Sequence, residues 1–510
     1  MFHLMVEYTP QQRAILAKSP TASFKVVAGA GCGKTSTLVL YSAHWAAQRG
    51  LYLAFNAAIA REARSRFGRQ VEARTAHSYA FADLGLRALE AGRLVPRYNL
   101  RHIRQLEAEL GLKAPPGSAE TVLKTLTAFL ISAGTKLTQA HCPERDVKTN
   151  RAIRTFVATA FKHLIRFEKH AFPITHDVYL KRFEMERKIT GYDYIMVDEA
   201  QDLNPVLLSI LEKSGLPLVV VGDPYQSIYA FRGAVDAMSS LKVQALPLSR
   251  SWRFGENIAR LANGILRTHA SPPPYPLQGN PALQSTVRHY GGKIRPTSNT
   301  LVLARSNVRL FESLVNIKTP FHVLGGVQDM MQEIRSALTL YRRHANPAAR
   351  GAENTLPFGT WKELVAAKEG ENADPIAKRL FTIVDKHGYE LAEKMETIQT
   401  LYRDTPDEVN LVCSTAHKAK GREFETVIML DDFLSPVEWA TRREKAIERM
   451  AALEDNAEFS EKYKLRQKEK QRQRIQECTQ EINVLYVACT RAQKLLYVPD
   501  GLYTFWQEKC

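Results

Sequence analysis

Short apolar runs recur along the chain, and each is followed by polar or glycine residues at its C-terminal end. Runs of this kind are typical of strands buried on both faces of a parallel sheet. The stretches between them are long enough to hold crossover helices. The pattern therefore predicts two α/β sheets, one in each half of the chain. The predicted strands are Phe24–Ala28, Leu51–Phe55, Tyr194–Val197 and Leu218–Val221 in the first half, and Leu301–Ala304, Leu411–Ser414, Val427–Leu430 and Leu495–Val498 in the second.

A long helix-like stretch separates the second predicted strand from the third. It includes Leu100–Leu112 and Arg151–Lys169, with a Pro-Gly break at Pro115–Gly117. We expect a helical insertion there. A second insertion is expected at about Gln328–Thr405, which begins with apolar residues at helical spacing.

The segment Thr441–Gln480 is rich in Lys, Arg, Glu and Gln and contains neither glycine nor proline, which predicts one or two long exposed helices. Basic residues two apart on a helix are expected to spread around the cylinder. A solvated helix and a contact with DNA are both open interpretations of this segment. The basic residues are Lys462, Lys464, Arg466, Lys468, Lys470, Arg472 and Arg474.

These patterns predict four parts of the chain. Residues 1–75 and 186–250 form the first sheet domain, and residues 76–185 form its helical insertion. Residues 251–327 and 406–510 form the second sheet domain, which carries the charged segment 441–480. Residues 328–405 form a short insertion in that second domain.

The composition supports a globular protein with an anionic partner. A chain of 510 residues predicts about three or four domains. Hydrophobic residues make up 45% and charged residues 24%, which gives enough apolar material for sizeable cores. Lys and Arg number 70 against 53 Asp and Glu, a net charge of +17 that favours polyanions such as nucleic acid. A basic enzyme with an unrelated substrate is the alternative.

The cysteines and the N-terminal segment bear on location. The six cysteines show no CxxC pair and no neighbouring histidine set, so we expect reduced thiols and no zinc or iron–sulfur site. No stretch approaches the roughly 18 apolar residues of a membrane span, and the N-terminus lacks the pattern of a secretory signal. We expect a cytoplasmic, nucleoid-associated location, or a nuclear one in a eukaryote, with no membrane partner.

A phosphate-binding loop follows the first predicted strand. The sequence AGAGCGKTSTL begins at Ala28 and leads into a helix-compatible stretch, the order that a phosphate loop requires. Its glycines let backbone N–H groups close around a phosphate, Lys34 reaches the phosphate oxygens, and the Thr35 hydroxyl holds Mg²⁺. Ala28 stands where the general pattern has its first glycine. The predicted nucleotide contacts are Ala28, Gly29, Ala30, Gly31, Cys32, Gly33, Lys34, Thr35 and Ser36.

Two further strands end in polar residues suited to hydrolysis. YIMVDEAQD places Asp198 to reach Mg²⁺ and Glu199 to polarise an attacking water. VVVGDPYQSIYAFRGA places Gln226 to sense the γ-phosphate, with Tyr229 and Phe231 as nearby aromatic faces. Buried core aromatics are the alternative for the last two.

The ordered motifs resemble those of the UvrD/Rep-type superfamily 1 DNA helicases. The sequence around FNAAIAREA and TAHKAKG is similar to the helicase portion of the F-box DNA helicases, although no separate F-box region is recognised. The motifs are YTPQQ from Tyr8, AGAGCGKT from Ala28, LAFNAAIAREA from Leu53, RTAHSYAF from Arg74, VDEAQD from Val197, GDPYQSIYAFRGA from Gly222, SRSWRF from Ser249, STAHKAKGREFETVIML from Ser414 and LYVACTRA from Leu485.

The resemblance implies two RecA-like parallel-sheet domains with helical insertions and an ATP site between them. It implies that Gln12 reads the adenine edge, that Trp252 stacks on the base in place of the family's usual tyrosine, and that Glu423 holds the ribose. Arg253 and Arg491 match the arginines that reach the γ-phosphate from the second domain. An arginine finger contributes about 10³ to 10⁵ in turnover in related enzymes.

The resemblance also implies a path for single-stranded DNA, gripped by stacking and backbone contacts. Ordinary capping or hydrogen-bonding roles are the alternative for each polar residue in it. The two histidines are not spaced as metal ligands. The implied DNA contacts are Phe55, Asn56, His77, Ser78, Tyr229, Phe231, Thr415 and His417.

The sequence therefore predicts an ATP- and Mg²⁺-dependent DNA helicase or translocase that acts on single strands and duplex junctions. The resemblance implies 3′ to 5′ polarity, which no residue sets by itself. An ATP-gated nucleic-acid clamp without unwinding activity is the alternative, and RNA as the track is not excluded.

Overall fold

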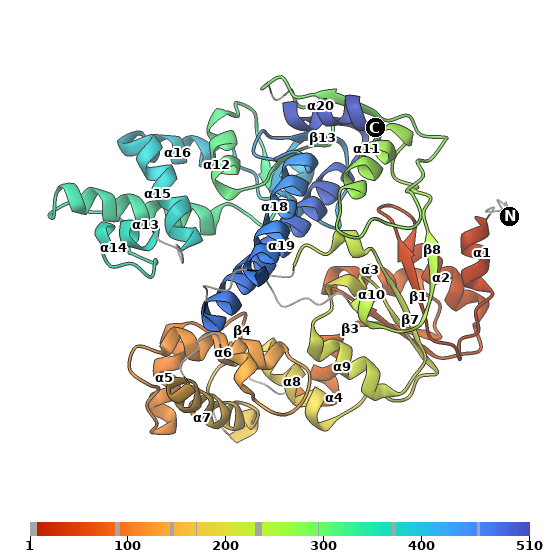
Figure 1. Ribbon diagram of the computed structural model, residues 1–510, viewed down its shortest axis with the longest axis horizontal. Helices are drawn as coiled ribbons and strands as arrows, with labels where there is room; N and C mark the ends of the chain where they lie inside the picture. The colour runs from red at the N-terminus through yellow and green to blue at the C-terminus, as the bar shows by residue number, and fades with distance from the viewer. Residues whose placement is uncertain are drawn as a thin grey trace. The chain divides into compact units, whose positions relative to one another are not determined.

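The computed structural model describes residues 8–86, 92–142, 147–169, 171–229, 237–293, 295–369, 374–455 and 460–510. The chain divides into two compact units, Met1–Ser249 and Arg250–Cys510, each with its own sheet (Figure 1). The prediction of one parallel α/β sheet in each half is therefore confirmed. No helix in the described ranges combines the length and apolar character that a bilayer span requires.

The first unit is built on a six-stranded parallel sheet with the order β3-β2-β6-β7-β1-β8. Its four inner strands are the ones that the apolar pattern predicted. The edge strands β3 and β8 escaped prediction because they are only partly buried and carry polar or proline residues. The strands are β1 (Phe24–Ala28), β2 (Gly50–Ala54), β3 (Val71–Thr75), β6 (Tyr194–Val197), β7 (Leu218–Gly222) and β8 (Gln244–Leu248).

Parallel pairing brings the carboxyl ends of these strands to one edge of the sheet. Val27 lies opposite Gly222 on β7, and Leu53 lies opposite Val197 on β6. The loops that follow β1, β2, β6 and β7 therefore meet there, although they are far apart in the sequence. The helices of this unit are α1 (Pro10–Leu16), α2 (Lys34–His44), α3 (Ala57–Arg66), α4 (Ala76–Asp83), α5 (Leu100–Leu110), α6 (Ala119–Ile131), α7 (Val147–Leu164), α8 (His176–Glu186), α9 (Pro205–Ser214) and α10 (Ala237–Ser240).

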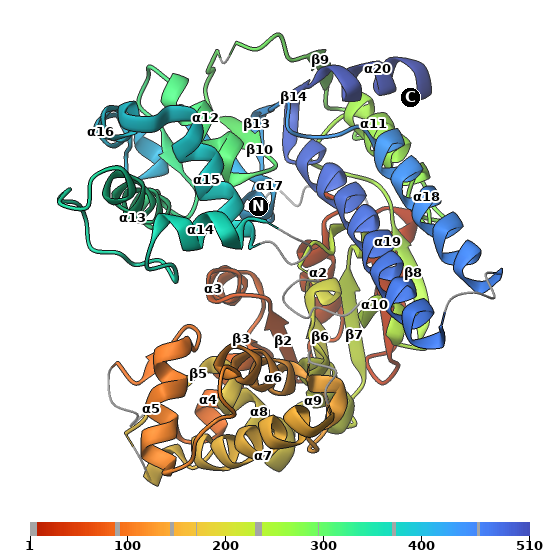
Figure 2. The same ribbon diagram turned by 60° about the vertical axis from the view of Figure 1, so that its left-hand side comes forward.

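The helices between β3 and β6 form the inserted part of the first unit (Figure 2). Ile103, Leu126 and Phe156 are buried in a hydrophobic core that continues to the sheet. A short two-stranded pairing of β4 (Leu94–Val95) with β5 (Ile174–Thr175) joins its two ends. Helix α5 stops short of the predicted Leu112 because Gly111 adopts a left-handed conformation, with φ of 60°, that caps the helix.

The second unit contains a six-stranded parallel sheet with the order β11-β12-β10-β13-β14-β9. The four predicted strands are its inner strands, and the short or exposed β11 and β9 form its edges. The strands are β9 (Thr286–His289), β10 (Thr300–Ala304), β11 (His322–Val323), β12 (Leu411–Thr415), β13 (Phe424–Met429) and β14 (Ala492–Val498).

The helices α13 to α16 lie between β11 and β12, and their buried residues belong to a hydrophobic core that continues to the second sheet. The Trp361 and Phe381 rings stack with centroids 5.7 Å apart, and the Lys368 ammonium lies 3.4 Å from the Phe381 centroid. The helices of this unit are α11 (Glu256–Arg267), α12 (Asn307–Asn316), α13 (Gln328–Ala345), α14 (Trp361–Ala367), α15 (Pro375–His387), α16 (Leu391–Leu401), α17 (Ala416–Ala419), α18 (Pro436–Asp455), α19 (Glu461–Cys489) and α20 (Asp500–Lys509).

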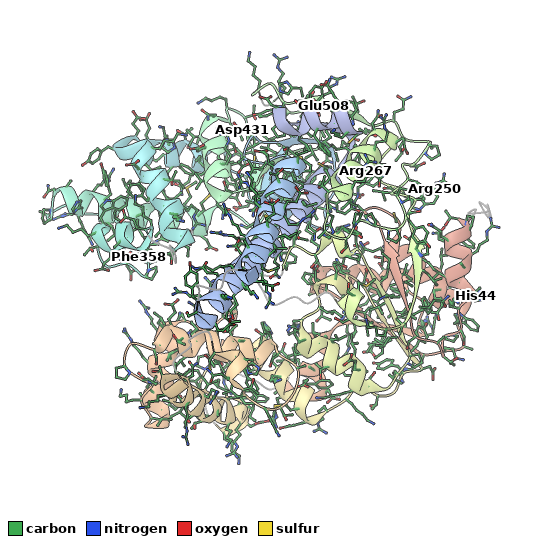
Figure 3. All side chains as sticks on the ribbon, viewed as in Figure 1. His44, Arg250, Arg267, Phe358, Asp431 and Glu508 are labelled. Carbon is green, nitrogen blue, oxygen red and sulfur yellow. The ribbon has the colours of Figure 1, made fainter. Side chains whose placement is uncertain are left out.

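Helices α18 and α19 pack side by side as a long hairpin (Figure 2). The C-terminal part of α19 is buried in the second unit, from Ile482 to Cys489. Helix α20 packs against α11, where the Arg267 guanidinium donates to the Lys509 carbonyl at 2.6 Å. Figure 3 labels Arg267 on α11 and Glu508 on α20.

Candidate nucleotide and nucleic-acid sites

The predicted phosphate loop joins β1 to α2 at the edge where the strands end. Gly31 and Gly33 adopt positive φ values of 72° and 76°, which favour glycine and turn successive N–H groups inward. Gly33 caps the N-terminus of α2, the end of a helix that favours anions. Ala28 needs no glycine because it is the last residue of β1, in ordinary extended pairing with Leu248.

Thr35 and Asp198 come together although they are far apart in the sequence. The Thr35 hydroxyl donates to Oδ2 of Asp198 at 2.7 Å, and the Tyr52 hydroxyl donates to the same oxygen at 2.8 Å. Burial and the charge of Glu199 raise the pKa of the Asp198 carboxyl. A hydroxyl beside a buried carboxylate is the hard oxygen donor set that Mg²⁺ prefers, so these residues fit the predicted metal. No cluster of three or more His, Cys, Asp or Glu side chains able to hold a metal occurs among the described residues.

Lys34 lies at the centre of the negative charge in this site. Its ammonium is 3.2 Å from Oε1 of Glu199, and its side chain is only 12% exposed. Burial alone would lower the pKa of Lys34, but the charges of Glu199, Asp223 and Asp198 outweigh burial and raise it. Glu199 has a φ of 52°, a left-handed conformation that costs backbone energy in a non-glycine residue and is frequent at functional sites.

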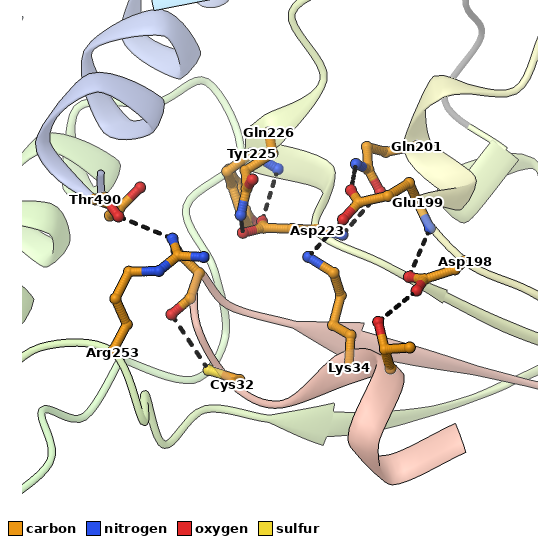
Figure 4. A network of polar contacts seen from close by, with 12 residues as sticks. Cys32, Lys34, Asp198, Glu199, Gln201, Asp223, Tyr225, Gln226, Arg253 and Thr490 are labelled. Carbon is orange, nitrogen blue, oxygen red and sulfur yellow. Dashed lines mark hydrogen bonds and ion pairs between the residues drawn. The ribbon is translucent and has the colours of Figure 1, made fainter. Parts of the chain in front are cut away.

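A chain of hydrogen bonds joins Glu199 to the predicted sensor Gln226 (Figure 4). The Gln201 amide donates to the Glu199 carboxylate, and its oxygen accepts from the backbone N–H of Asp223 at 3.0 Å. The Gln226 amide donates to Oδ2 of Asp223 at 2.7 Å. The loops that follow β6 and β7 are therefore connected by side-chain hydrogen bonds.

The predicted adenine contact Gln12 is mostly buried and already bonded. Its amide oxygen accepts from the backbone of Thr9 at 3.0 Å, and its amide nitrogen donates to the Thr37 hydroxyl at 3.4 Å. The neighbouring Gln11, which was not predicted, binds Ser249 through both ends of its amide. Ser36 accepts a hydrogen bond of 2.8 Å from Arg66.

The predicted residues of the second unit also converge, within that unit. The Arg253 guanidinium donates to Oε2 of Glu423 at 2.5 Å. It also donates to the Thr490 carbonyl at 2.9 Å (Figure 4). Arg491 is 1% exposed and donates to the carbonyls of Val487 and Arg422. The two arginines therefore flank one turn, the end of α19.

Trp252 presents a large aromatic surface beside this cluster. Its side chain is 43% exposed, and the Arg250 guanidinium lies 5.0 Å from its ring centroid. The predicted ribose contact Glu423 is shared between Arg253 and Gln493, which donates to it at 3.2 Å. The ring and the carboxylate are thus both available at the surface of the second unit.

Two of the predicted DNA contacts form an aromatic pair in the first unit. Phe55 is 45% exposed and stacks with Tyr229, with ring centroids 6.1 Å apart and planes 10° from parallel. Both rings line a cavity of about 790 Å³ that also reaches His77 and Asp198. The aromatic pair and the predicted metal ligand therefore border one cavity. The predicted contact Phe231 lies outside the described residues.

The remaining predicted DNA contacts have local structural roles. Asn56 caps α3 by accepting from Ile59 at 2.9 Å, and Ser78 forms a capping box with Thr75. His77 lies 4.0 Å from Asp177 and beside further aromatic rings. In the second unit, Thr415 precedes α17 and is buried, and His417 is half-buried on that helix.

Sequence reasoning missed Tyr52, Gln201, Asp223 and Gln11 as parts of these sites. Tyr52 sits inside an apolar strand, where an aromatic residue normally signals core packing. The other three lie within the recognised motifs, but their partners come from other loops. The one signal in the sequence was the hydroxyl of Tyr52, a polar group on a strand that ends at the same sheet edge as the phosphate loop.

Two family models match this chain, one within each of the two compact units. Residues 8–243 match the UvrD/REP helicase N-terminal domain, and residues 359–499 match the UvrD-like helicase C-terminal domain. The chain is 28% identical to F-box DNA helicase 1 of Gallus gallus, over 94% of this chain and 47% of that protein. It is 26% identical to F-box DNA helicase protein 1 of Schizosaccharomyces pombe, over 98% of this chain and 58% of that protein. The chain thus spans about half the length of these curated relatives.

Solved structures give weaker similarities. An arterivirus nonstructural protein 10 helicase in complex with DNA has a TM-score of 0.30 and 11% sequence identity, covering 98% of this chain and 65% of that one. The N-terminal match contains the phosphate loop and the acids at the end of β6, and the C-terminal match contains Glu423 and Arg491. The chain belongs to the family of UvrD-like helicases.

Proposed function

We propose that this chain is an ATP-dependent DNA helicase or translocase that moves 3′ to 5′ along single-stranded DNA and separates strands or displaces proteins. The observation that carries the proposal is the single network that joins Lys34, Thr35, Asp198, Glu199 and Gln226 at one edge of the first sheet. Family membership supports the helicase activity.

Nucleotide phosphates compete with Glu199 for Lys34. The Lys34 ammonium pairs with the Glu199 carboxylate. A bound triphosphate carries more negative charge and is a stronger partner for Lys34. Release from Lys34 leaves the Glu199 carboxylate able to accept a proton from an attacking water. Thr35 and Asp198 would hold Mg²⁺, which neutralises charge on the transferring phosphoryl group when bound.

The hydrogen-bond chain through Gln201 and Asp223 couples Glu199 to Gln226. A phosphate contact at Gln226 shifts its bond to Asp223, and that shift reaches Glu199 through the Gln201 amide. This arrangement makes the position of the catalytic carboxylate sensitive to whether the γ-phosphate is present.

Arg253 and Arg491 supply positive charge from the second unit. Arg491 is positioned by carbonyl contacts along α19, whereas Arg253 is held by Glu423 and can exchange that carboxylate for phosphate. We propose that hydrolysis occurs when closure of the two units brings these guanidinium groups to the γ-phosphate, a contribution of about 10³ to 10⁵ in turnover.

The track is single-stranded DNA, held by the Phe55–Tyr229 pair. The near-parallel rings of exposed Phe55 and half-buried Tyr229 offer faces on which bases stack without regard to sequence, at about 1 to 3 kcal/mol per base. The cavity that these rings share with Asp198 gives a short physical route from the track to the ATP site. We propose four domains for this motor: a first sheet domain of residues 1–75 and 186–250 with its insertion 76–185, and a second sheet domain of residues 251–327 and 406–510 with its insertion 328–405. We also propose that the motor acts where cellular DNA is found.

A strand-displacement assay tests the proposal. The protein with ATP and Mg²⁺ is expected to unwind duplexes that carry a 3′ overhang and to leave those with a 5′ overhang intact. The variant Glu199→Gln should keep ATP and single-strand binding and lose turnover, whereas Lys34→Ala should lose nucleotide affinity as well. Unwinding only from the 5′ overhang would contradict the polarity.

An ATP-gated clamp is the competing function. It binds nucleic acid and ATP without a single-strand-stimulated ATPase. Absence of that stimulation in the unmodified protein would favour the clamp, and stronger stimulation by a matched RNA than by DNA would make RNA the track.

A further inference from the structure

The α18–α19 hairpin carries a row of positive charge that the proposed function does not use. Helix α19 has 29 residues, about 43 Å at the usual helical rise. Between Glu461 and Glu477 the described side chains are exposed or half-buried apart from Gln471, so this stretch stands away from the core of the second unit.

The described basic side chains of this stretch lie on two faces of the helix, so they do not form one stripe, in agreement with the spread predicted from their spacing. Lys464 and Lys468 face the hairpin interior, with side chains 14% and 24% exposed. Lys468 lies 2.9 Å from the Glu454 carboxylate of α18, and Lys464 lies 3.7 Å from Glu461. Acidic groups of the hairpin itself therefore balance this inner set.

The second set lies on another face of α19. Arg466, Lys470 and Arg474 follow one another at intervals of four residues, which places them on one side of a helix at steps of about 6 Å. Arg466 and Arg474 are exposed and Lys470 is partly exposed. These three residues are called the α19 basic row below.

We propose that the α19 basic row binds the phosphate backbone of a nucleic-acid duplex. A rigid helix holds its three cations in a nearly straight line, which suits the fixed phosphate positions of a duplex, where successive phosphates on one strand rise by about 3.4 Å. Single strands are gripped by successive aromatic platforms, and the only strongly exposed aromatic described on α19 is Tyr463. The proposal names a second contact of the proposed motor and rests on that function, since a helicase meets a duplex ahead of its single-stranded track.

The α19 basic row is joined by one continuous helix to the turn that Arg253 and Arg491 flank. Helix α19 runs without interruption from Arg466 to Cys489, and the next residue, Thr490, accepts the hydrogen bond from Arg253. The duplex contact and the arginines are therefore the two ends of one element.

The salt dependence of duplex binding tests the proposal. Each neutralised phosphate contributes about 0.9 to the slope of log affinity against log salt for duplex DNA, and about 0.7 for single strands. Binding of the full chain to a blunt labelled duplex, without ATP, would be measured by fluorescence anisotropy over a range of salt. The variant Arg466→Gln/Lys470→Gln/Arg474→Gln is expected to lower the duplex slope by about 2.7.

Arg472 provides a matched control on the same helix. It is exposed, but it lies two residues from Arg474 and hence on a different side of α19. Arg474→Gln should lower the duplex slope by about 0.9, whereas Arg472→Gln should leave it unchanged. Gln is a good helix former, so helical content by circular dichroism should match in all variants.

Three outcomes overturn the inference in folded variants. These are an unchanged duplex slope in the triple variant, equal effects of Arg472→Gln and Arg474→Gln, and a reduced slope on single strands alone. The single-strand-stimulated ATPase of the unmodified protein is measured separately. Its absence would remove the proposed function, whereas its presence with an unchanged duplex slope would remove only the duplex contact.

Discussion

At the scale of single residues, the nucleotide site depends on a tyrosine that no motif contains. Tyr52 on β2 and Thr35 on α2 donate to the same oxygen of Asp198, and these bonds favour the charged carboxylate against burial. Removing either donor therefore makes the carboxylate harder to ionise.

The variant Tyr52→Phe is expected to move the acid limb of the Mg²⁺-dependent ATPase to higher pH. Asp198 has to be ionised to hold the metal, so activity is present above its pKa and is lost as the pH falls through it. Loss of the tyrosine bond raises that pKa further. Well above the raised pKa the carboxylate is ionised in both proteins, so the difference in turnover should be smallest at alkaline pH. A pH profile of kcat checks this, and an unshifted acid limb would contradict it.

Phe55 should matter for the track and little for folding, because its ring is largely exposed. Phe55→Ala is expected to weaken single-strand binding by about 1 to 3 kcal/mol, roughly fivefold to a hundredfold in Kd. Anisotropy with a labelled oligonucleotide measures the loss. The control is Tyr275→Ala, which removes another exposed aromatic outside the proposed track and should leave the Kd unchanged.

At the scale of elements, a buried charge cluster ties the inserted helices of the first unit to its sheet domain. Lys181 on α8 is fully buried, lies 3.1 Å from Glu184 and donates to the carbonyl of Ser132 at 2.8 Å. Glu184 also accepts from Lys213 and Ser209 of α9. Helices α8 and α9 and the loop after α6 are thereby joined through one carboxylate.

Glu184→Gln is expected to destabilise the first unit by about 3 to 5 kcal/mol, because it leaves the buried Lys181 without its counter-charge. Burial alone would raise the pKa of Glu184, but the bonds from Lys213, Ser209 and Lys181 outweigh burial and lower it. Its contribution is therefore complete above the ordinary carboxyl pKa and is lost as the pH falls through the lowered one. The midpoint of urea unfolding measures the effect, and the double variant Lys181→Met/Glu184→Met should recover part of it. Equal midpoints for the unmodified protein and Glu184→Gln would contradict this role.

At the scale of the whole molecule, the two units divide the chemistry between them. The first contains the phosphate loop, both acids and the aromatic pair, and the second contains Arg253, Arg491 and Trp252. Under the proposed mechanism we therefore expect turnover to depend on both units and phosphate binding to depend mainly on the first.

Arg253→Ala is expected to lower kcat by about 10³ while nucleotide affinity changes much less. The guanidinium acts on charge that develops at the γ-phosphate, so its effect falls on turnover. Steady-state ATPase and binding of a fluorescent nucleotide separate the two quantities. Arg250→Ala removes the cation over Trp252 and should raise KM with little effect on kcat. A large rise in Kd with unchanged kcat in Arg253→Ala would refute this role.

Local patterns alone were sufficient for the central strands, the phosphate loop and the adjacent acids. Each of these is contiguous in sequence, and its chemistry depends on neighbouring residues: apolar runs between turns, glycines at positive φ, and a helix that begins at Gly33. The family motifs added the helicase family, which the two domain matches confirm, and the roles of the two arginines, which stay predictions.

Tertiary structure decided which distant side chains share an atom and which face of a helix remains exposed. Tyr52 reaches Asp198 because β2 and β6 are neighbours in register, and strand order is not encoded in any local run of residues. The charges of α19 separate into an inner and an outer set because α18 covers one side of the helix. Sequence determines which groups are present and how they repeat, whereas packing determines their partners, because burial and contact arise only between elements that the fold has brought together.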